Sequence, residues 1–202
     1  MDHNNILGTV LAGGKSKRFG DDKSQAELSG KLLIDYILSE IKDEFKEILV
    51  ISNRQINFEK IGKILLIEDF KKGLGPLGGV LSAMKWVKDN NKEYKWISTF
   101  PVDTPFFKKS IFQKFLQNIK FEESKLFFIK SNNIRHNIFG LWSIDLMEKL
   151  EEDLDRGERK VEMWANSIGV KVVNIEFLNE DPFFNINTKE DFEKAKEKLK
   201  ND

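Results

Sequence analysis

An apolar run that leads directly into a glycine-rich, basic loop is the feature of this sequence that most limits how the chain can fold. Residues 6 to 11 read Ile-Leu-Gly-Thr-Val-Leu, a pattern typical of a strand buried within a parallel sheet. The loop that follows contains Gly13, Gly14 and Gly20. Glycine permits backbone angles and a close ligand approach that a side chain would prevent. The pattern therefore predicts a strand that ends at an anion-binding loop.

Basic side chains of the same loop strengthen this prediction. They are Lys15, Lys17, Arg18 and Lys23. Together with consecutive backbone N–H groups, these charges suit a triphosphate. A P-loop is excluded, because residues 14 to 16 have the ending of that motif but Thr9 stands where its first glycine belongs. The glycine spacing also departs from the dinucleotide-binding pattern G-x-G-x-x-G, and a plain turn with solvated lysines remains the alternative.

Residues 11 to 23 resemble a known family signature. They read Leu-Ala-Gly-Gly-Lys-Ser-Lys-Arg-Phe-Gly-Asp-Asp-Lys, which is similar to the L-A-G-G-x-S-x-R-M-G-x-D-K of the molybdenum cofactor guanylyltransferase family. Phe19 replaces the usual Met and keeps an apolar side chain. The resemblance continues in the same order to about residue 195. It implies a single-domain, Rossmann-like, three-layer α/β/α nucleotidyltransferase of the nucleotide-diphospho-sugar transferase type, with a mostly parallel sheet.

The composition excludes several other classes of protein. In a chain of 202 residues, 33 basic and 33 acidic side chains cancel, so no global field attracts nucleic acid or an anionic membrane. The absence of cysteine excludes disulfides, thiolate metal sites and a cysteine nucleophile. No run approaches the roughly 18 apolar residues of a membrane helix, and the first residues do not resemble a signal peptide. We expect one cytoplasmic domain over residues 1–202.

The hydrophobic periodicity alternates between strands and helices along the chain. Strands are expected at residues 47–52, 63–68, 96–101, 126–129, 138–142 and 171–175, and helices at 32–45, 76–87, 110–120, 144–168 with a break at 156–160, and beyond 188. Thr188 and Asp191 resemble a capping box at the start of the last helix, whose Phe192, Ala195 and Leu199 are expected to face the sheet. Such alternation favours a mostly parallel sheet with helices on both faces.

Asp69 follows the third expected strand, and ligands of open α/β sheets lie at the carboxyl ends of strands. From its position alone, Asp69 is equally well explained as a turn-forming residue. The family carries an aspartate here that is implicated in nucleotide binding, and an asparagine near the end of the second strand, for which this chain offers Asn53. Residues 75 to 79 resemble the family's G-P-L-x-G, and Pro76 suits a first helical turn.

Asp103 follows another expected strand and lies between Pro101 and Pro105, which stiffen the backbone on both sides. A carboxylate held in this way suits Mg²⁺, which binds one or two carboxylates together with substrate phosphates and water. The stretch resembles the family's P-C-D-x-P, with Val102 in place of Cys. A turn-forming aspartate is the alternative.

The resemblance assigns roles to these and other residues. For catalysis it implies Arg18, Lys23 and Asp103, with Asp103 as the Mg²⁺ ligand. For the nucleotide it implies Leu11, Ala12, Gly13, Gly14, Lys23, Asn53, Asp69, Gly75, Pro76, Leu77, Gly78 and Asp103. For the second substrate it implies His136, Arg159, Lys160, Asn185 and Asn187. A single histidine such as His136 is more often structural or merely exposed, which is the alternative for this residue.

The family resemblance implies transfer of GMP from GTP to molybdopterin or Mo-molybdopterin, with release of pyrophosphate. It also implies contacts with molybdenum insertion proteins and target molybdoenzymes. Two alternatives stay open. One is a related transferase that uses CTP on molybdopterin or activates a sugar phosphate, and the other is a non-catalytic nucleotide-binding or cofactor-binding protein.

Overall fold

The computed structural model describes residues 3–13, 26–56, 58, 63–177 and 181–201. Most of the predicted phosphate loop, including Gly14, Arg18 and Lys23, lies outside these residues. The predicted roles of these three residues therefore remain predictions.

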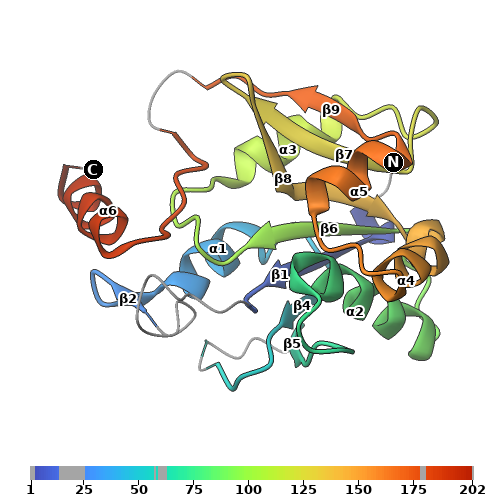
Figure 1. Cartoon of the computed structure of the whole chain (residues 1–202). Coiled ribbons are helices and arrows are strands. Elements are labelled where there is room, and N and C mark those ends of the chain that lie inside the picture. Colours follow the sequence, from blue (N-terminus) through green and yellow to red (C-terminus); the bar gives the residue numbers. More distant parts are fainter. Residues whose placement is uncertain (1–2, 14–25, 57, 59–62, 178–180, 202) are drawn as a thin grey trace.

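A seven-stranded sheet forms the centre of the described structure, with the strand order β5-β4-β1-β6-β8-β7-β9 (Figure 1). Its strands are β1 (Ile6–Leu11), β4 (Ile48–Ile51), β5 (Ile64–Ile67), β6 (Trp96–Pro101), β7 (Leu126–Ser131), β8 (Ile134–Ser143) and β9 (Lys171–Asn174). β1 pairs in parallel with β4 on one side and with β6 on the other. β8 runs antiparallel to β6 and to β7. The expected mostly parallel sheet is confirmed.

Helices cover both faces of this sheet (Figure 1). They are α1 (Leu33–Ile41), α2 (Gly75–Asp89), α3 (Lys109–Gln117), α4 (Met147–Asp155), α5 (Val161–Ile168) and α6 (Lys189–Asn201), with short 3-10 turns η1 (His3–Asn5) and η3 (Ile144–Leu146). Side chains of α1 and α3 share one hydrophobic cluster, and those of α2, α4 and α5 share another. The predicted break in the 144–168 helix is confirmed by the gap between α4 and α5.

The apolar sequence of β1 follows from its central position. Ile6 and Val10 lie in the cluster with α1 and α3, whereas Leu7 and Leu11 lie in the cluster with α2. All six residues of β1 are buried. A strand covered on both faces needs apolar side chains on both, so its sequence is a run and not an alternation.

β8 begins earlier than the sequence indicates. We expected a strand at 138–142, but β8 starts at Ile134 and includes His136. The reason is a two-residue turn at Asn132 and Asn133, where φ is 46° and 62°, which joins β7 to β8 as a hairpin. Asparagine tolerates this left-handed conformation better than most residues.

α6 does not cover the large sheet, so the expectation that its apolar side chains face that sheet is wrong. Ala195 packs in a third cluster, which also receives partly buried Phe192 and Leu199 from the same helix. The buried members of this cluster are Leu28, Leu33, Phe106, Ile186 and Ala195. Leu28 belongs to a separate two-stranded ribbon of β2 (Glu27–Leu28) and β3 (Lys31–Leu32), and Figure 1 shows α6 beside this ribbon. The faces of the large sheet are already covered by the other helices.

Candidate active site

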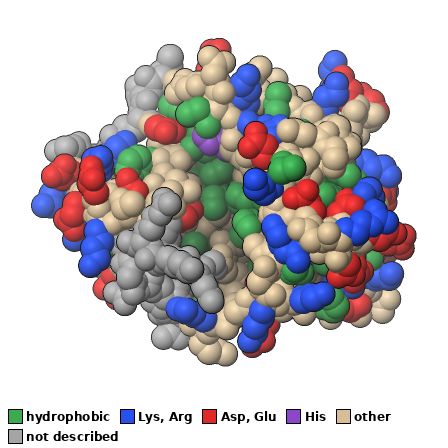
Figure 2. Space-filling view, viewed as in Figure 1, with side chains coloured by type: hydrophobic (Ala, Val, Ile, Leu, Met, Phe, Trp, Pro, Cys, Tyr) green, Lys and Arg blue, Asp and Glu red, His purple; other side chains and the backbone are tan. Residues whose placement is uncertain are grey.

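Four neighbouring parallel strands, β5, β4, β1 and β6, end at the same edge of the sheet. Four predicted site residues lie two positions beyond the ends of these strands, with Gly13 after β1, Asn53 after β4, Asp69 after β5 and Asp103 after β6. Backbone bonds continue the pairing beyond the strands, since the N–H of Ala12 donates to the Ile51 carbonyl at 3.0 Å. Figure 2 shows the molecular surface hollowed on this side, with hydrophobic side chains inside the hollow.

Asn53 and Asp69 form a direct pair at this edge. The Nδ2 atom of Asn53 donates to Oδ2 of Asp69 at 2.6 Å. The other amide atom, Oδ1 of Asn53, is buried and has no hydrogen-bond partner among the described residues. A Cβ atom added to Gly13 would lie 3.5 Å from Oδ2 of Asp69, so the predicted phosphate loop begins beside this pair. Burial raises the pKa of the Asp69 carboxyl above its usual value, although the bond from Asn53 acts in the opposite direction.

The start of α2 is pressed against the same carboxylate. A Cβ atom on Gly79 would lie 2.8 Å from Cδ2 of Leu11 and 3.6 Å from Oδ1 of Asp69, so glycine lets the helix approach β1 and Asp69 closely. Gly75 and Pro76 are exposed at the helix start. Leu77 and Gly78 are buried, and the Leu77 side chain packs in the core, so a nucleotide contact at Leu77 would have to use its backbone.

Ser82 was missed by the sequence reasoning. Its hydroxyl accepts from the N–H of Phe70 at 2.8 Å and donates to the Gly78 carbonyl at 2.8 Å. These two bonds fix the residue after Asp69 to the first turn of α2. A serine on the otherwise apolar buried face of a helix was the available signal, because a buried hydroxyl needs hydrogen-bond partners.

Asp103 is half-buried and is tied to a distant part of the chain. Its backbone carbonyl accepts from the N–H of Ile186 at 2.9 Å. Ile186 is fully buried, and its neighbours Asn185 and Asn187 are both exposed. The structure therefore brings the two predicted asparagines to the turn that carries the predicted metal ligand.

His136 supports this same segment. Its ring stacks on Phe183 with the ring centres 3.8 Å apart, and its Nε2 lies 2.7 Å from the hydroxyl of Ser131. Burial lowers the pKa of His136 below its usual value, although the nearby charge of Asp181 opposes this effect. The imidazole is therefore mainly neutral at pH 7, and its contacts connect β8 to the chain that leads to Asn185.

Arg159 and Lys160 are exposed in the corner between α4 and α5. Nη1 of Arg159 donates to the carbonyls of Leu154 and Glu158, and the Glu158 carboxylate accepts from the N–H groups of Arg159 and Lys160. Among the described contacts, these bonds stay within the corner. The structure does not bring Arg159 together with the residues at the strand ends.

A metal site built from protein ligands alone is absent from the described residues, since they contain no group of three or more His, Cys, Asp or Glu side chains that could hold an ion. Asp103 offers a hard carboxylate oxygen at the carboxyl end of β6. This donor fits Mg²⁺, which commonly takes one or two carboxylates and completes its shell with substrate phosphates and water. The described residues thus fit a metal that arrives with a nucleotide.

Comparison with known proteins gives matches over most of the chain. Residues 8–168 match the family model described as MobA-like NTP transferase domain. The molybdenum cofactor guanylyltransferase of Nitrobacter hamburgensis is 28% identical over 191 residues, which are 93% of this chain and 91% of that protein. A probable molybdenum cofactor guanylyltransferase of Bacillus cereus is 32% identical over 201 residues, which cover 96% and 98% of the two chains.

Solved structures show the same fold. The molybdopterin-guanine dinucleotide biosynthesis protein A of Archaeoglobus fulgidus has a TM-score of 0.77 at 22% identity, with 97% of this chain and 100% of that chain covered. The 4-diphosphocytidyl-2C-methyl-D-erythritol synthase of Anaerococcus prevotii has a TM-score of 0.72 at 16% identity, with 98% and 100% covered. The three-layer arrangement is thus that of known nucleotidyltransferases. In the described part of the chain, no helix has the length and apolar character needed to cross a membrane.

Proposed function

The chain belongs to the MobA-like NTP transferase family, and from this premise we propose that it transfers GMP from GTP to the terminal phosphate of molybdopterin. Pyrophosphate is released and a guanine dinucleotide cofactor is formed. The observation that supports GTP as the nucleotide substrate is the hydrogen-bonded Asn53–Asp69 pair. It lies against Gly13 at the carboxyl edge of the sheet. On the same premise, the proposed setting is the cytoplasm, and molybdenum insertion proteins and target molybdoenzymes are proposed partners.

Guanine is the base whose edge complements this pair. It presents two neighbouring donors, N1–H and the exocyclic amino group, and a carboxylate can accept from both. Adenine and cytosine each place an acceptor nitrogen where guanine has N1–H, so either base would set a lone pair against the Asp69 carboxylate. The buried Oδ1 of Asn53 is a further acceptor beside it. The pair therefore supports GTP over ATP and CTP.

The transfer itself needs no covalent nucleophile. An oxygen of the molybdopterin phosphate forms a bond to the α-phosphorus of GTP while the bond to the bridging oxygen breaks, and pyrophosphate leaves with that electron pair. Two anions must approach each other, so catalysis depends on alignment and charge neutralisation. We assign Asp103 to hold Mg²⁺, which when bound neutralises phosphate charge. Arg18 and Lys23, outside the described residues, are assigned to the departing pyrophosphate.

The acceptor is assigned to the other side of Asp103. The exposed Asn185 and Asn187 offer amide donors to its phosphate, and His136 holds the segment that carries them. Lys160 is kept as a proposed contact because it is exposed, whereas the guanidinium of Arg159 is engaged with carbonyls of its own corner.

Calorimetric titration with Mg-GTP, Mg-CTP and Mg-ATP tests this proposal. We expect the wild-type protein to bind Mg-GTP selectively, and the Asp69→Ala, Asp103→Ala and Lys23→Ala variants to bind it weakly. Asp155→Ala is the matched control, because Asp155 is exposed at the end of α4 and pairs with Lys71. A preference for CTP or ATP would indicate a related transferase, and absence of nucleotide binding would contradict the site. Binding without pyrophosphate release in the presence of acceptor would favour the non-catalytic alternative.

A further inference from the structure

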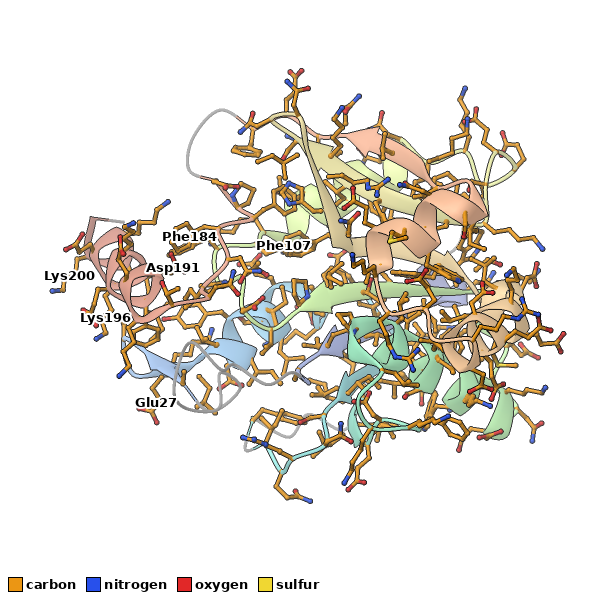
Figure 3. All side chains as sticks on the ribbon, in the orientation of Figure 1. Glu27, Phe107, Phe184, Asp191, Lys196 and Lys200 are labelled. Atoms are coloured by element: carbon orange, nitrogen blue, oxygen red, sulfur yellow. The ribbon has the colours of Figure 1, made fainter. Side chains whose placement is uncertain are left out.

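The segment of residues 181–188, which connects β9 to α6, is held to the rest of the protein at several points. Phe183 stacks on His136 near its start, and the Ile186 side chain is buried in the middle. Its last residues meet the first turn of α6, where Asp191 lies (Figure 3). Such anchoring is unusual for a surface connection and calls for a physical reason.

The carboxylate of Asp191 makes more bonds than a helix cap requires. Thr188 and Asp191 form the predicted capping box, since the Asp191 N–H donates to Oγ1 of Thr188 at 3.1 Å and the Thr188 N–H donates to Oδ2 of Asp191 at 2.9 Å. The same Oδ2 also accepts from the N–H of Asn187 at 3.0 Å. This additional bond restrains a residue that lies before the helix cap.

The bond to Asn187 completes a continuous set of backbone restraints. The N–H of Ile186 donates to the carbonyl of Asp103, and the next two N–H groups, those of Asn187 and Thr188, donate to Asp191. Three successive N–H groups are thus fixed, one to the turn of the predicted metal ligand and two to α6. The backbone that carries Asn185 and Asn187 therefore has a defined position relative to Asp103.

We propose that Asp191 is a positioning residue for the acceptor phosphate, because its carboxylate holds the Asn185–Asn187 backbone in register with Asp103. This inference rests on the proposed function, in which the two asparagines bind the acceptor. The charged state needed for this role is favoured, since the N–H groups of Asn187 and Thr188 hold the pKa of Asp191 below its usual value.

The two halves of the capping box allow a positioning role to be separated from a helix-stabilising role. Asp191→Ala removes the acceptor of the Asn187 and Thr188 N–H groups. Thr188→Ala removes the hydroxyl that accepts from the Asp191 N–H and bonds to the Asp191 carboxylate, but it leaves that carboxylate in place to accept from the Asn187 and Thr188 N–H groups. Both changes weaken the start of α6 and should lower Tm by a similar amount. Only the first should release the Asn185–Asn187 backbone.

Steady-state kinetics on the full chain then tests the role. For Asp191→Ala we expect the KM of the acceptor to rise by about tenfold because the loop is misplaced, while the Kd of Mg-GTP is unchanged. Thr188→Ala should keep the wild-type acceptor KM, and Asp191→Glu, which has the usual capping-box carboxylate, should restore most of it. An unchanged acceptor KM in Asp191→Ala, or an equal rise in Thr188→Ala, would overturn the proposal.

Backbone amide exchange gives a test that does not need the reaction. The amides of Asn187 and Thr188 should be protected in the wild-type protein and in Thr188→Ala, and should exchange faster in Asp191→Ala. A wild-type protein that released no pyrophosphate would show that the proposed function is wrong. Unprotected wild-type amides at Asn187 and Thr188 would instead overturn the positioning role itself.

Discussion

At the scale of single residues, Asp69 affects both the stability of the unliganded protein and the proposed binding of GTP, in opposite directions. Its folded-state pKa is raised by burial, so ionisation at neutral pH disfavours folding. The contribution of this carboxyl to the free energy of unfolding is fully present below its unfolded pKa of about 3.9. It is lost as the pH rises through the raised pKa of the folded state. The charge that the proposed site needs therefore opposes the stability of the unliganded protein.

Asp69→Asn should raise the Tm of the unliganded protein at pH 7, because it removes the charge and keeps an oxygen for the Asn53 amide. The advantage should shrink as the pH is lowered through the raised folded pKa towards about 4. The same variant should lose selective Mg-GTP binding. Thermal unfolding of both proteins across this range measures the difference, with the exposed Asp155→Asn as control. A less stable Asp69→Asn protein at pH 7 would contradict the argument.

Two buried threonines that lie opposite each other in the sheet differ in the hydrogen bonds of their hydroxyl groups. Thr9 of β1 pairs in register with Thr99 of β6, and both are fully buried. The Thr99 hydroxyl accepts from Nε1 of Trp142 at 2.8 Å and donates to the Ile138 carbonyl at 2.5 Å. The Thr9 hydroxyl has no hydrogen-bond partner among the described residues.

Thr9→Val should therefore leave stability unchanged or raise it by about 1 kcal/mol, because an unpartnered buried hydroxyl is replaced by an isosteric methyl group. Thr99→Val should cost about 1–3 kcal/mol, because the buried Trp142 indole and the Ile138 carbonyl would lose their partner. Urea unfolding of the two variants measures both effects. Equal losses would show that the Thr9 hydroxyl does have a stabilising bond.

Site residues at the ends of strands are easier to predict from the sequence than residues whose role depends on contacts with distant parts of the chain. Asp69 and Asp103 could be found because each follows an apolar run, and the ends of parallel strands meet at one edge. Nothing in the local pattern shows that Asn53 donates to Asp69, or that Asp191 restrains Asn187. Arg159 lies in a basic cluster that suggests a ligand contact, and Nη1 of its guanidinium donates to carbonyls of its own corner, so its contact with the second substrate stays a prediction.

At the scale of elements, the β7–β8 hairpin depends on its two-residue turn. Asn132 and Asn133 both have positive φ, at 46° and 62°. Asn133→Ala should cost about 1 kcal/mol because alanine is strained in this conformation, whereas Asn133→Gly should be neutral or stabilising. The free energy of unfolding in urea distinguishes the two. Comparable losses in both variants would indicate that the asparagine side chain, and not its backbone, matters.

Elements were predicted well where their apolar period was strong and poorly where another element decided the outcome. The run Ile48–Ile51 of β4 and the face of α2 could be assigned directly. The start of β8 could not, because Arg135 and His136 are polar and join the strand through pairing with β7. The apolar face of α6 was recognised, but its partner was not, since no local pattern shows which surfaces other helices already occupy.

At the scale of the whole molecule, charges balance and hydrophobic packing on two faces of one sheet carries the fold. Ion pairs such as Lys71–Asp155, with side chains 59% and 64% exposed, contribute about 0–1 kcal/mol each. Stability should therefore change little with salt. Bound ligand is expected to matter more, because it lowers the free energy of the folded state alone.

Mg-GTP at about 100 times its Kd should raise the free energy of unfolding by about 2.7 kcal/mol. Mg-CTP and Mg-ATP at the same concentration should raise it less, because the stabilisation grows with the logarithm of the ratio of ligand concentration to Kd. Thermal unfolding with each nucleotide, repeated on Asp103→Ala, measures this linkage. Equal shifts for all three nucleotides would contradict the proposed choice of guanine.

The antiparallel strand β8 of the seven-stranded sheet also has a consequence for how quickly different parts of the molecule assemble. β7 and β8 are joined by two residues and can zip together locally, whereas β1 must find β6 across the long interval that separates Ile6 from Trp96. Closing a long loop slows the formation of such pairs. Refolding should thus be accelerated by Asn133→Gly if the hairpin forms before the rate-limiting step. The pairing of β1 with β6 would then form after the hairpin, and a newly made chain would complete the predicted nucleotide site only once these two strands have met.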